Sequence, residues 1–127
     1  MGSFDLKYFM LEEFDSPDHK GSGINMQQSF LVLLDQARDI AGTPFKITSG
    51  YRTQSYNQSL RDRGYKASIN SSHTKGYAAD IAITSSLQRY IILNALLKVG
   101  FDRIGIADSF IHVDNDPDKP KGVCWVY

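Results

Sequence analysis

Two mainly apolar segments of this chain are typical of buried β-strands, and each carries a potential metal ligand at its centre. Tyr77–Ile83 contains Asp80, and Phe110–Asp114 contains His112. A second histidine, His73, stands seven residues before Asp80, in the segment that leads into the first strand. Because a strand alternates its side chains between the two faces of a sheet, Asp80 and His112 can point to the same side from neighbouring strands.

These three side chains are typical of a catalytic metal site. Two neutral imidazoles and one carboxylate hold Zn²⁺ tetrahedrally and leave the fourth position open for water. Gly76 permits a turn that a side chain would block, and Ala78 and Ala82 leave space beside a metal. Zn²⁺ in such a site lowers the pKa of water to about 7 and polarises a carbonyl, which supports amide hydrolysis. From spacing alone, the alternative of hydrogen-bonded structural histidines stays open.

Composition narrows the broad class of protein. The length of 127 residues predicts a single domain that spans residues 1–127, and we expect it to be a monomer. Fourteen basic and fourteen acidic side chains cancel, so no bulk charge favours binding to nucleic acid or to an anionic membrane. The single cysteine, Cys124, rules out an internal disulfide. Next to Trp125, it is expected to be buried and inert.

The N-terminal part shows no targeting signal. Met1–Asp5 has no basic region followed by an apolar run, and the longest apolar stretch, Tyr90–Val99, is too short to span a membrane. We therefore expect a protein that is made in the cytoplasm and does not insert into membranes. Residues 1–25 are predicted to form an arm laid over the domain that ends in a turn-rich loop. The aromatic anchors of this arm are Phe4, Tyr8, Phe9 and Phe14.

The rest of the chain predicts helices packed on a small, mainly antiparallel sheet, which is an α+β fold class. Asn25 and Gln28 resemble a capping box, Thr53 is an expected N-cap, and Thr84 or Ser85 caps the last helix. The expected helices cover residues 25–41, 53–63 and 85–99. The expected strands cover residues 45–49, 77–83, 103–106, 110–114 and 123–127, of which 103–106 and 110–114 form a hairpin and 123–127 an edge strand.

Three motifs follow one another along the chain. They are Ile47–Thr53, the pattern Ser71-x-His73-x-x-Gly76-x-Ala78-x-Asp80, and Phe110–Asp114. In this order, over residues 45–114, they resemble the zinc D-Ala-D-Ala carboxypeptidases and peptidoglycan peptidases of the M15 family, members of its subfamily A in particular. The resemblance implies one Zn²⁺ per chain, held by His73, Asp80 and His112. It also implies the hedgehog/DD-peptidase-like fold, a small antiparallel sheet flanked by helices.

Two further residues match family positions that face the substrate. Arg52 matches the family arginine, whose guanidinium can hold a C-terminal carboxylate or stabilise a tetrahedral oxyanion. Without the resemblance, Arg52 would be interpreted as a surface residue at the start of a helix. Ser71 matches the family serine that contacts substrate. We therefore expect Arg52 to be catalytic and substrate-binding, and Ser71 to be substrate-binding.

The general base is where this chain departs from the family pattern. Relatives carry Glu or Asp three residues before the last zinc histidine, or His two before it. Here Ser109 and Phe110 stand at these positions, and neither takes a proton from water. Asp114 is the nearest carboxylate on the face of His112 and is our candidate for the base, with Asp108 as the alternative. Asp114 can instead accept the free N–H of a ligand imidazole.

The resemblance implies hydrolysis of peptides that end in, or are linked through, D-alanine, with peptidoglycan stem peptides as partners. A carboxypeptidase would remove a terminal D-alanine, whereas an endopeptidase would cut a stem or cross-link in the manner of an endolysin. A zinc-containing muropeptide-binding module without turnover is the third alternative, which the hedgehog relative shows the fold permits. The lack of a cell-wall-binding module fits a phage or prophage product that acts on the cell wall.

Overall fold

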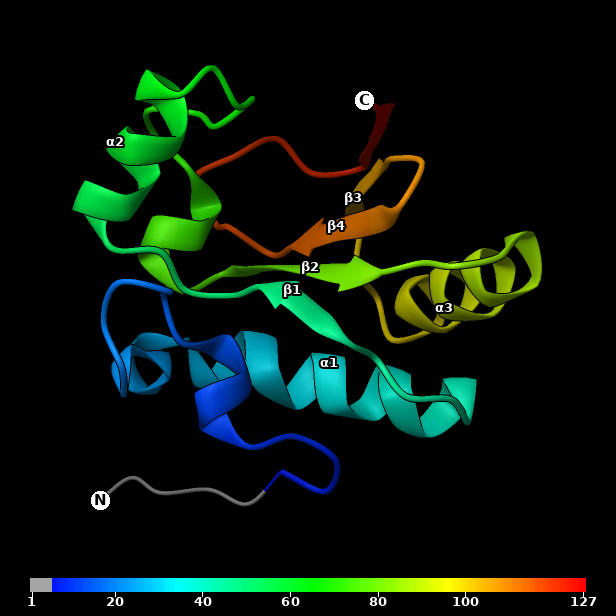
Figure 1. Cartoon of the computed structure of the whole chain (residues 1–127). Helices are drawn as coiled ribbons and strands as arrows, with labels where there is room; N and C mark the ends of the chain where they lie inside the picture. Colours follow the sequence, from blue (N-terminus) through cyan, green and yellow to red (C-terminus); the bar gives the residue numbers. More distant parts are fainter. Residues whose placement is uncertain (1–5) are drawn as a thin grey trace.

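The computed structural model describes residues 6–127 and consists of one five-stranded sheet with helices on both sides (Figure 1). The α-helices are α1 (Gln28–Ala41), α2 (Gln54–Asp62) and α3 (Ser86–Lys98). The strands are β1 (Ile47–Ser49), β2 (Ala78–Ala82), β3 (Arg103–Ile106), β4 (Phe110–Asp114) and β5 (Val123–Val126). Short 3₁₀ helices are η1 (Leu11–Phe14), η2 (Ser22–Asn25) and η3 (Ser72–Lys75). The expected α+β fold class is confirmed.

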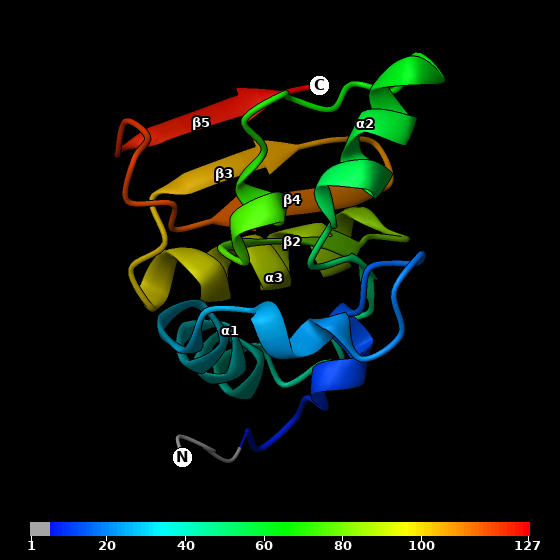
Figure 2. The ribbon, with the colours of Figure 1, turned by 90° about the vertical axis from the view of Figure 1, so that its left-hand side faces the viewer.

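The strands follow the order β1-β2-β4-β3-β5, and Figure 2 shows β2, β4, β3 and β5 in succession. The pairs β1–β2, β2–β4 and β3–β4 are antiparallel, whereas β5 runs parallel to β3 at the edge. The expected hairpin between β3 and β4 is present, and the N–H of Ala107 donates to the carbonyl of Phe110 across its turn (3.0 Å). The sheet is thus mainly antiparallel, as expected.

The alternation of β2 and β4 separates a core face from a polar face. Ala79 and Ile81 of β2, with Ile111 and Val113 of β4, point into a core that α1 and α3 complete. The helical side chains of this core are Phe30, Leu31, Leu34, Ala37, Ile92, Ala95 and Leu96. Since these strand residues face the helices, the residues between them, including Asp80, point to the other side of the sheet.

The N-terminal arm belongs to the core. Phe9 and Phe14 are buried in it, whereas Phe4 lies outside the described residues. The carbonyl of Phe14 accepts the N–H of Tyr51 (2.8 Å). Gly50 lies so close that a Cβ atom on it would stand 2.7 Å from Cα of Phe14, so only glycine permits this approach. The arm therefore fixes the segment that follows β1.

Two of the expected helix caps are present and one is wrong. Thr53 and Ser85 accept the N–H groups of Tyr56 (3.0 Å) and Gln88 (3.1 Å). Asn25, in contrast, ends η2, and α1 begins only at Gln28. The reason is a long-range contact, because the residues between η2 and α1 lie against Gly76, whose carbonyl accepts the N–H of Gln27 (2.9 Å).

The expected burial of Cys124 is also wrong, because its side chain is exposed. It lies on the outermost strand of the sheet, which has a neighbour on one side only. A groove lined by Ile104 and by Leu93 and Leu97 of α3 runs beside it, so α3 does not pack closely enough to bury the thiol. In the described part of the chain, no helix is both long and apolar enough to cross a bilayer.

Candidate metal centre and active site

One row of residues crosses the polar face of the sheet. Paired directly across neighbouring strands, the row consists of Ser49, Asp80, His112, Gly105 and Trp125. Directly paired residues of a sheet point to the same face, so these side chains stand beside one another. The expected placement of Asp80 and His112 on the same side of two neighbouring strands is confirmed.

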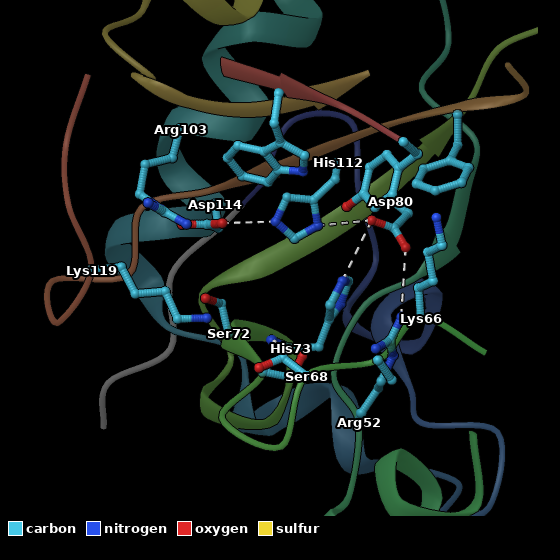
Figure 3. Close-up of a pocket in the computed structure, with 15 residues that line it drawn as sticks. Arg52, Lys66, Ser68, Ser72, His73, Asp80, Arg103, His112, Asp114 and Lys119 are labelled. Atoms are coloured by element: carbon cyan, nitrogen blue, oxygen red, sulfur yellow. Dashed lines mark hydrogen bonds and ion pairs between the residues drawn. The ribbon is translucent and has the colours of Figure 1, made fainter. Parts of the chain in front are cut away.

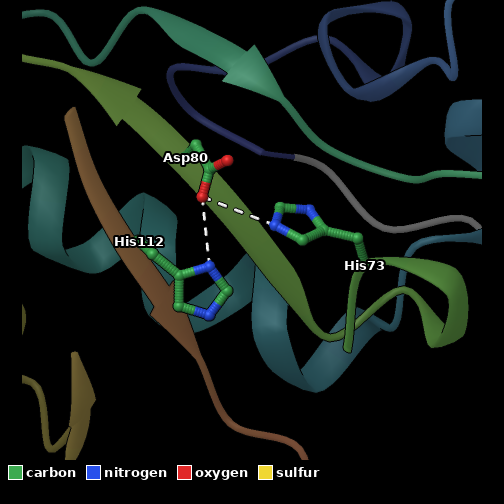
Figure 4. A group of neighbouring side chains, drawn as sticks. All are labelled: His73, Asp80 and His112. Carbon is green, nitrogen blue, oxygen red and sulfur yellow. Dashed lines mark hydrogen bonds and ion pairs between the residues drawn. The ribbon is translucent and has the colours of Figure 1, made fainter. Parts of the chain in front are cut away.

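His73 completes the group from outside the sheet (Figure 4). It lies in η3, whose first turn is capped by Ser71, since the hydroxyl oxygen of Ser71 accepts the N–H of His73 (3.2 Å). The turn ends at Gly76 with φ of +80°, a left-handed conformation that favours glycine. One ligand atom each from His73, Asp80 and His112 lies within 4.8 Å of the others, and all three residues are buried.

The hydrogen bonds of the two imidazoles leave one ring nitrogen of each directed at the same carboxylate. Nδ1 of His73 donates to the carbonyl of Gly50 (2.8 Å), and Nε2 of His112 donates to Oδ2 of Asp114 (2.7 Å). The remaining nitrogens, Nε2 of His73 and Nδ1 of His112, lie 3.4 and 3.1 Å from Oδ1 of Asp80. Three electron pairs that converge in this way repel one another unless a proton or a cation lies between them. The group therefore fits a metal ion.

Charge around the group is consistent with this fit. Burial raises the pKa of Asp80, but the neighbouring imidazoles of His73 and His112 outweigh it and hold that pKa well below its usual range. Burial lowers the pKa of His73 and favours the neutral imidazole, which is the form that binds metals. Burial also lowers the pKa of His112, but hydrogen bonds to Asp114 and Asp80 raise it further than burial lowers it. The two carboxylates therefore favour positive charge at this ring, as a proton or as a bound cation.

Arg52 lies beside this group. One guanidinium nitrogen, Nη2, stands 3.7 Å from Oδ2 of Asp80, the oxygen that does not face the imidazoles. Its Nε donates to the hydroxyl of Ser49 (3.1 Å), and Nη1 donates to the side-chain carbonyl of Asn57 (3.3 Å). The side chain is only 12% exposed, so its position is fixed by these partners. The structure thus brings Arg52 and Ser71, both predicted to bind substrate, to the edge of one pocket.

The comparison with protein families matches this geometry. A family model described as Peptidase M15 matches residues 7–114. The chain belongs to the M15 peptidases. This assignment makes it a metallopeptidase, and His73, Asp80 and His112 form the group that could hold its metal. A comparison with curated proteins found no match.

Asp114, the predicted base of this M15 peptidase, has both of its carboxylate oxygens engaged. Oδ2 accepts from His112, and Oδ1 accepts the Nε–H of Arg103 (2.7 Å) and the N–H of Asp116 (3.2 Å). Burial raises the pKa of Asp114, but the hydrogen bonds and charges of His112 and Arg103 outweigh it, so that pKa lies below its usual value. The alternative base, Asp108, is exposed in the β3–β4 turn and does not line the pocket.

Sequence reasoning missed Arg103. Its guanidinium bonds to Asp114, donates to the carbonyl of Pro120 (2.6 Å) and lies over the ring of Trp125, 5.3 Å from the ring centroid. The same indole lies 5.5 Å from the ring centroid of His112. The predicted hairpin contained a signal for this arrangement, because Ile104 pairs with Val113 and the same register continued by one residue brings Arg103 opposite Asp114.

The M15 site opens into a cavity of about 270 Å³ (Figure 3). Four cationic side chains line it, namely Arg52, Lys66, Arg103 and Lys119. A second cavity of about 440 Å³ adds Tyr56 and Tyr65, and it shares with the first Arg52, Lys66, Ala67, Asp80, Phe110 and Tyr127. The two cavities therefore adjoin: Arg103 and Lys119 line only the first, and Tyr56 and Tyr65 line only the second. Lys66 and Lys119 were not predicted, because both lie in loops that show no periodic pattern.

Proposed function

We propose that this M15 peptidase uses Zn²⁺ to hydrolyse peptide bonds that involve D-alanine in peptidoglycan stem peptides, as a D-Ala-D-Ala carboxypeptidase does. One observation carries the proposal. The inner nitrogens of His73 and His112 converge on Oδ1 of Asp80, while the outer nitrogens already have acceptors. Membership of the M15 family supports a peptidase rather than another metal protein.

In this proposal, His73, Asp80 and His112 hold the metal. When bound, Zn²⁺ supplies the Lewis acidity that polarises the scissile carbonyl and activates water. The protein contributes the orientation of the ligands. The carbonyl of Gly50 fixes the ring of His73, and the carboxylate of Asp114 fixes the ring of His112. Partners of this kind typically change metal affinity about 10- to 100-fold.

Arg52 binds the substrate in this proposal. Ser49 and Asn57 hold its guanidinium with one N–H group toward Asp80, and the remaining donors can meet a C-terminal carboxylate or a developing oxyanion. A residue that holds the terminal carboxylate favours the carboxypeptidase over the endopeptidase. Ser71 lines the same pocket, and its hydroxyl hydrogen has no acceptor among residues 6–127, so it can donate to substrate.

The position of Asp114 favours a role in orienting the imidazole of His112 over a role as general base. A carboxylate with a low pKa and both oxygens bonded is a weak proton acceptor. Asp80 and Asp114 are the two carboxylates among the residues that line the first cavity. This shortage of bases favours, as the second candidate function, a zinc-containing module that binds muropeptides without turnover.

An assay of the purified, zinc-loaded protein separates the alternatives. Muropeptides that end in D-Ala-D-Ala and cross-linked muropeptides are incubated with and without a chelator, and the products are analysed. Release of free D-alanine supports the carboxypeptidase, and new stem-peptide amines support an endopeptidase of the phage endolysin type. Binding without cleavage supports the binding module. Cleavage that survives complete removal of the metal would contradict the proposal.

A further inference from the structure

Lys119 lies at the end of the pocket that faces away from Arg52. It belongs to the loop between β4 and β5, and its side chain is 22% exposed. Figure 3 shows it beside Ser72 and Asp114, whereas Arg52 stands on the side of Asp80. The metal-binding group therefore lies between two cationic side chains.

The ammonium group of Lys119 is only weakly paired within the protein. The nearest carboxylate oxygen is Oδ2 of Asp116, at 4.0 Å. That oxygen already accepts the hydroxyl of Ser72 (2.8 Å) and the ammonium of Lys75 (2.9 Å). Both oxygens of Asp114 are engaged as well. Within residues 6–127, Lys119 Nζ forms no hydrogen bond, so its donors are available to a ligand.

The charge of the pocket favours an anionic ligand. Its lining carries four cationic side chains, and both of its carboxylates are already bonded to protein groups. Burial lowers the pKa of Lys119, and the carboxylates of Asp116 and Asp114 act against this. A partly desolvated ammonium without a close partner gains most from a negatively charged group that enters the pocket.

We propose that Lys119 is a second carboxylate-binding site of the pocket, on the opposite side of the scissile amide from the group that Arg52 binds. The substrate class is then a peptide with at least two carboxylates, one on each side of the bond that is cut. The inference relies on the proposed function for the identity of that peptide. A stem pentapeptide with diaminopimelate satisfies the requirement, because it has a glutamate and a diaminopimelate carboxylate besides its C-terminus.

The test compares stem pentapeptides in which one carboxylate at a time is converted to an amide. Each peptide is offered to the zinc-loaded wild type and to the variants Lys119→Gln, Lys119→Arg and Arg52→Gln. Lys121→Gln is the matched control, since Lys121 is exposed in the same loop and does not line the pocket. Dissociation constants are measured by calorimetry on analogues with N-methylated scissile amides, and KM and kcat on the cleavable peptides.

We expect one carboxylate on the N-terminal side of the scissile bond to be the one that Lys119 binds. Its amidation should weaken binding of the peptide about 10-fold in the wild type and in Lys121→Gln, as for a charged hydrogen bond in a partly exposed site. The same amidation should have no effect on binding in Lys119→Gln, and Lys119→Arg should restore most of the effect. Amidation of the peptide's C-terminus should weaken binding in the wild type but not in Arg52→Gln. On the cleavable peptides, loss of the carboxylate that Lys119 binds should raise KM and leave kcat unchanged.

Equal effects of every amidation in the wild type and in Lys119→Gln would overturn the inference. A loss of kcat in Lys119→Gln without a change in binding would also overturn it. If the wild type cleaves none of the peptides, the proposed function fails. The dissociation constants would in that case still decide whether Lys119 binds a carboxylate.

Discussion

Nε2 of His112 lies 2.7 Å from Oδ2 of Asp114, on the opposite side of the imidazole from Asp80. In the neutral ring, the form that binds a metal, this hydrogen bond assigns the N–H to Nε2 and leaves the lone pair on Nδ1, facing Asp80 and His73. It also occupies the carboxylate that the sequence offers as a general base. The distinction between the two roles of Asp114 can be measured.

Asp114→Asn tests the orienting role. The amide keeps the shape of the side chain but removes the charge that pairs with His112 and Arg103. We expect zinc affinity to fall about 10- to 100-fold, because a neutral amide holds the imidazole less strongly and makes it a weaker ligand than a carboxylate does. Competition with a chromogenic chelator measures this affinity. Unchanged zinc affinity together with lost turnover would instead identify Asp114 as the base.

Zinc stoichiometry tests the metal site itself. His112→Ala removes a ligand from the group, and we expect metal content to fall from one zinc per chain to well below half after dialysis. His19→Ala is the control, because His19 is exposed in the N-terminal arm and should leave the stoichiometry unchanged. Metal content is measured by atomic emission. Full zinc occupancy in His112→Ala would show that this histidine is only structural.

Gly105→Ala tests the packing of the indole beside the site. A Cβ atom on Gly105 would stand 2.4 Å from Nε1 of Trp125, so the indole must move. We expect a loss of about 1–3 kcal/mol in the free energy of unfolding, as for overpacking. A change in fluorescence should accompany it, because Trp125 is the single tryptophan of the chain.

Urea denaturation measures the stability, and Ser109→Ala in the same hairpin should leave both signals unchanged. An alanine variant with the stability and fluorescence of the wild type would show that the indole does not pack against Gly105.

The pH dependence of stability tests the buried Asp116, whose side chain is 0% exposed. Burial raises its pKa, but hydrogen bonds from Lys75, from the N–H of Asp118 and from Ser72 outweigh this and lower it. A carboxyl group whose pKa is lower in the folded than in the unfolded chain stabilises the fold above its unfolded pKa, about 3.9. That stability is lost as the pH falls below this value.

We therefore expect Asp116→Asn to lower the free energy of unfolding by about 1–3 kcal/mol at pH 7. The difference from wild type should shrink as the pH falls from 4 to 2. Denaturation in urea at several pH values measures both. Asp118→Asn is the control, since this side chain is 73% exposed and lies 3.5 Å from the same lysine. A difference between wild type and Asp116→Asn that stays constant down to pH 2 would contradict the assignment.

Local patterns were sufficient to predict the centre of the sheet. Asp80 and His112 each stand between apolar neighbours in a strand, and the period of two places both on the face opposite those neighbours. The caps at Thr53 and Ser85 were predictable for a similar reason, because a cap depends on residues within one helical turn.

The incorrect or missing predictions all depend on contacts between distant segments. Asn25 matches a capping box, but the approach of Gly76 moves the start of α1 to Gln28. Cys124 lies in an apolar run, yet the run forms the outermost strand of the sheet and leaves the thiol exposed. Lys119 lines the pocket from the loop between β4 and β5, and no periodic pattern encodes the path of such a loop.

The unequal attachment of the three metal-binding side chains has a consequence for exchange of the ion. Asp80 and His112 project from paired central strands, where their spacing is locked by the sheet. His73 instead depends on η3, a single short turn closed by Gly76. Opening of residues 71–76 would release one ligand without unfolding the sheet. The bound ion should therefore dissociate and exchange at the rate of this local opening, which hydrogen exchange at the amide of His73 measures.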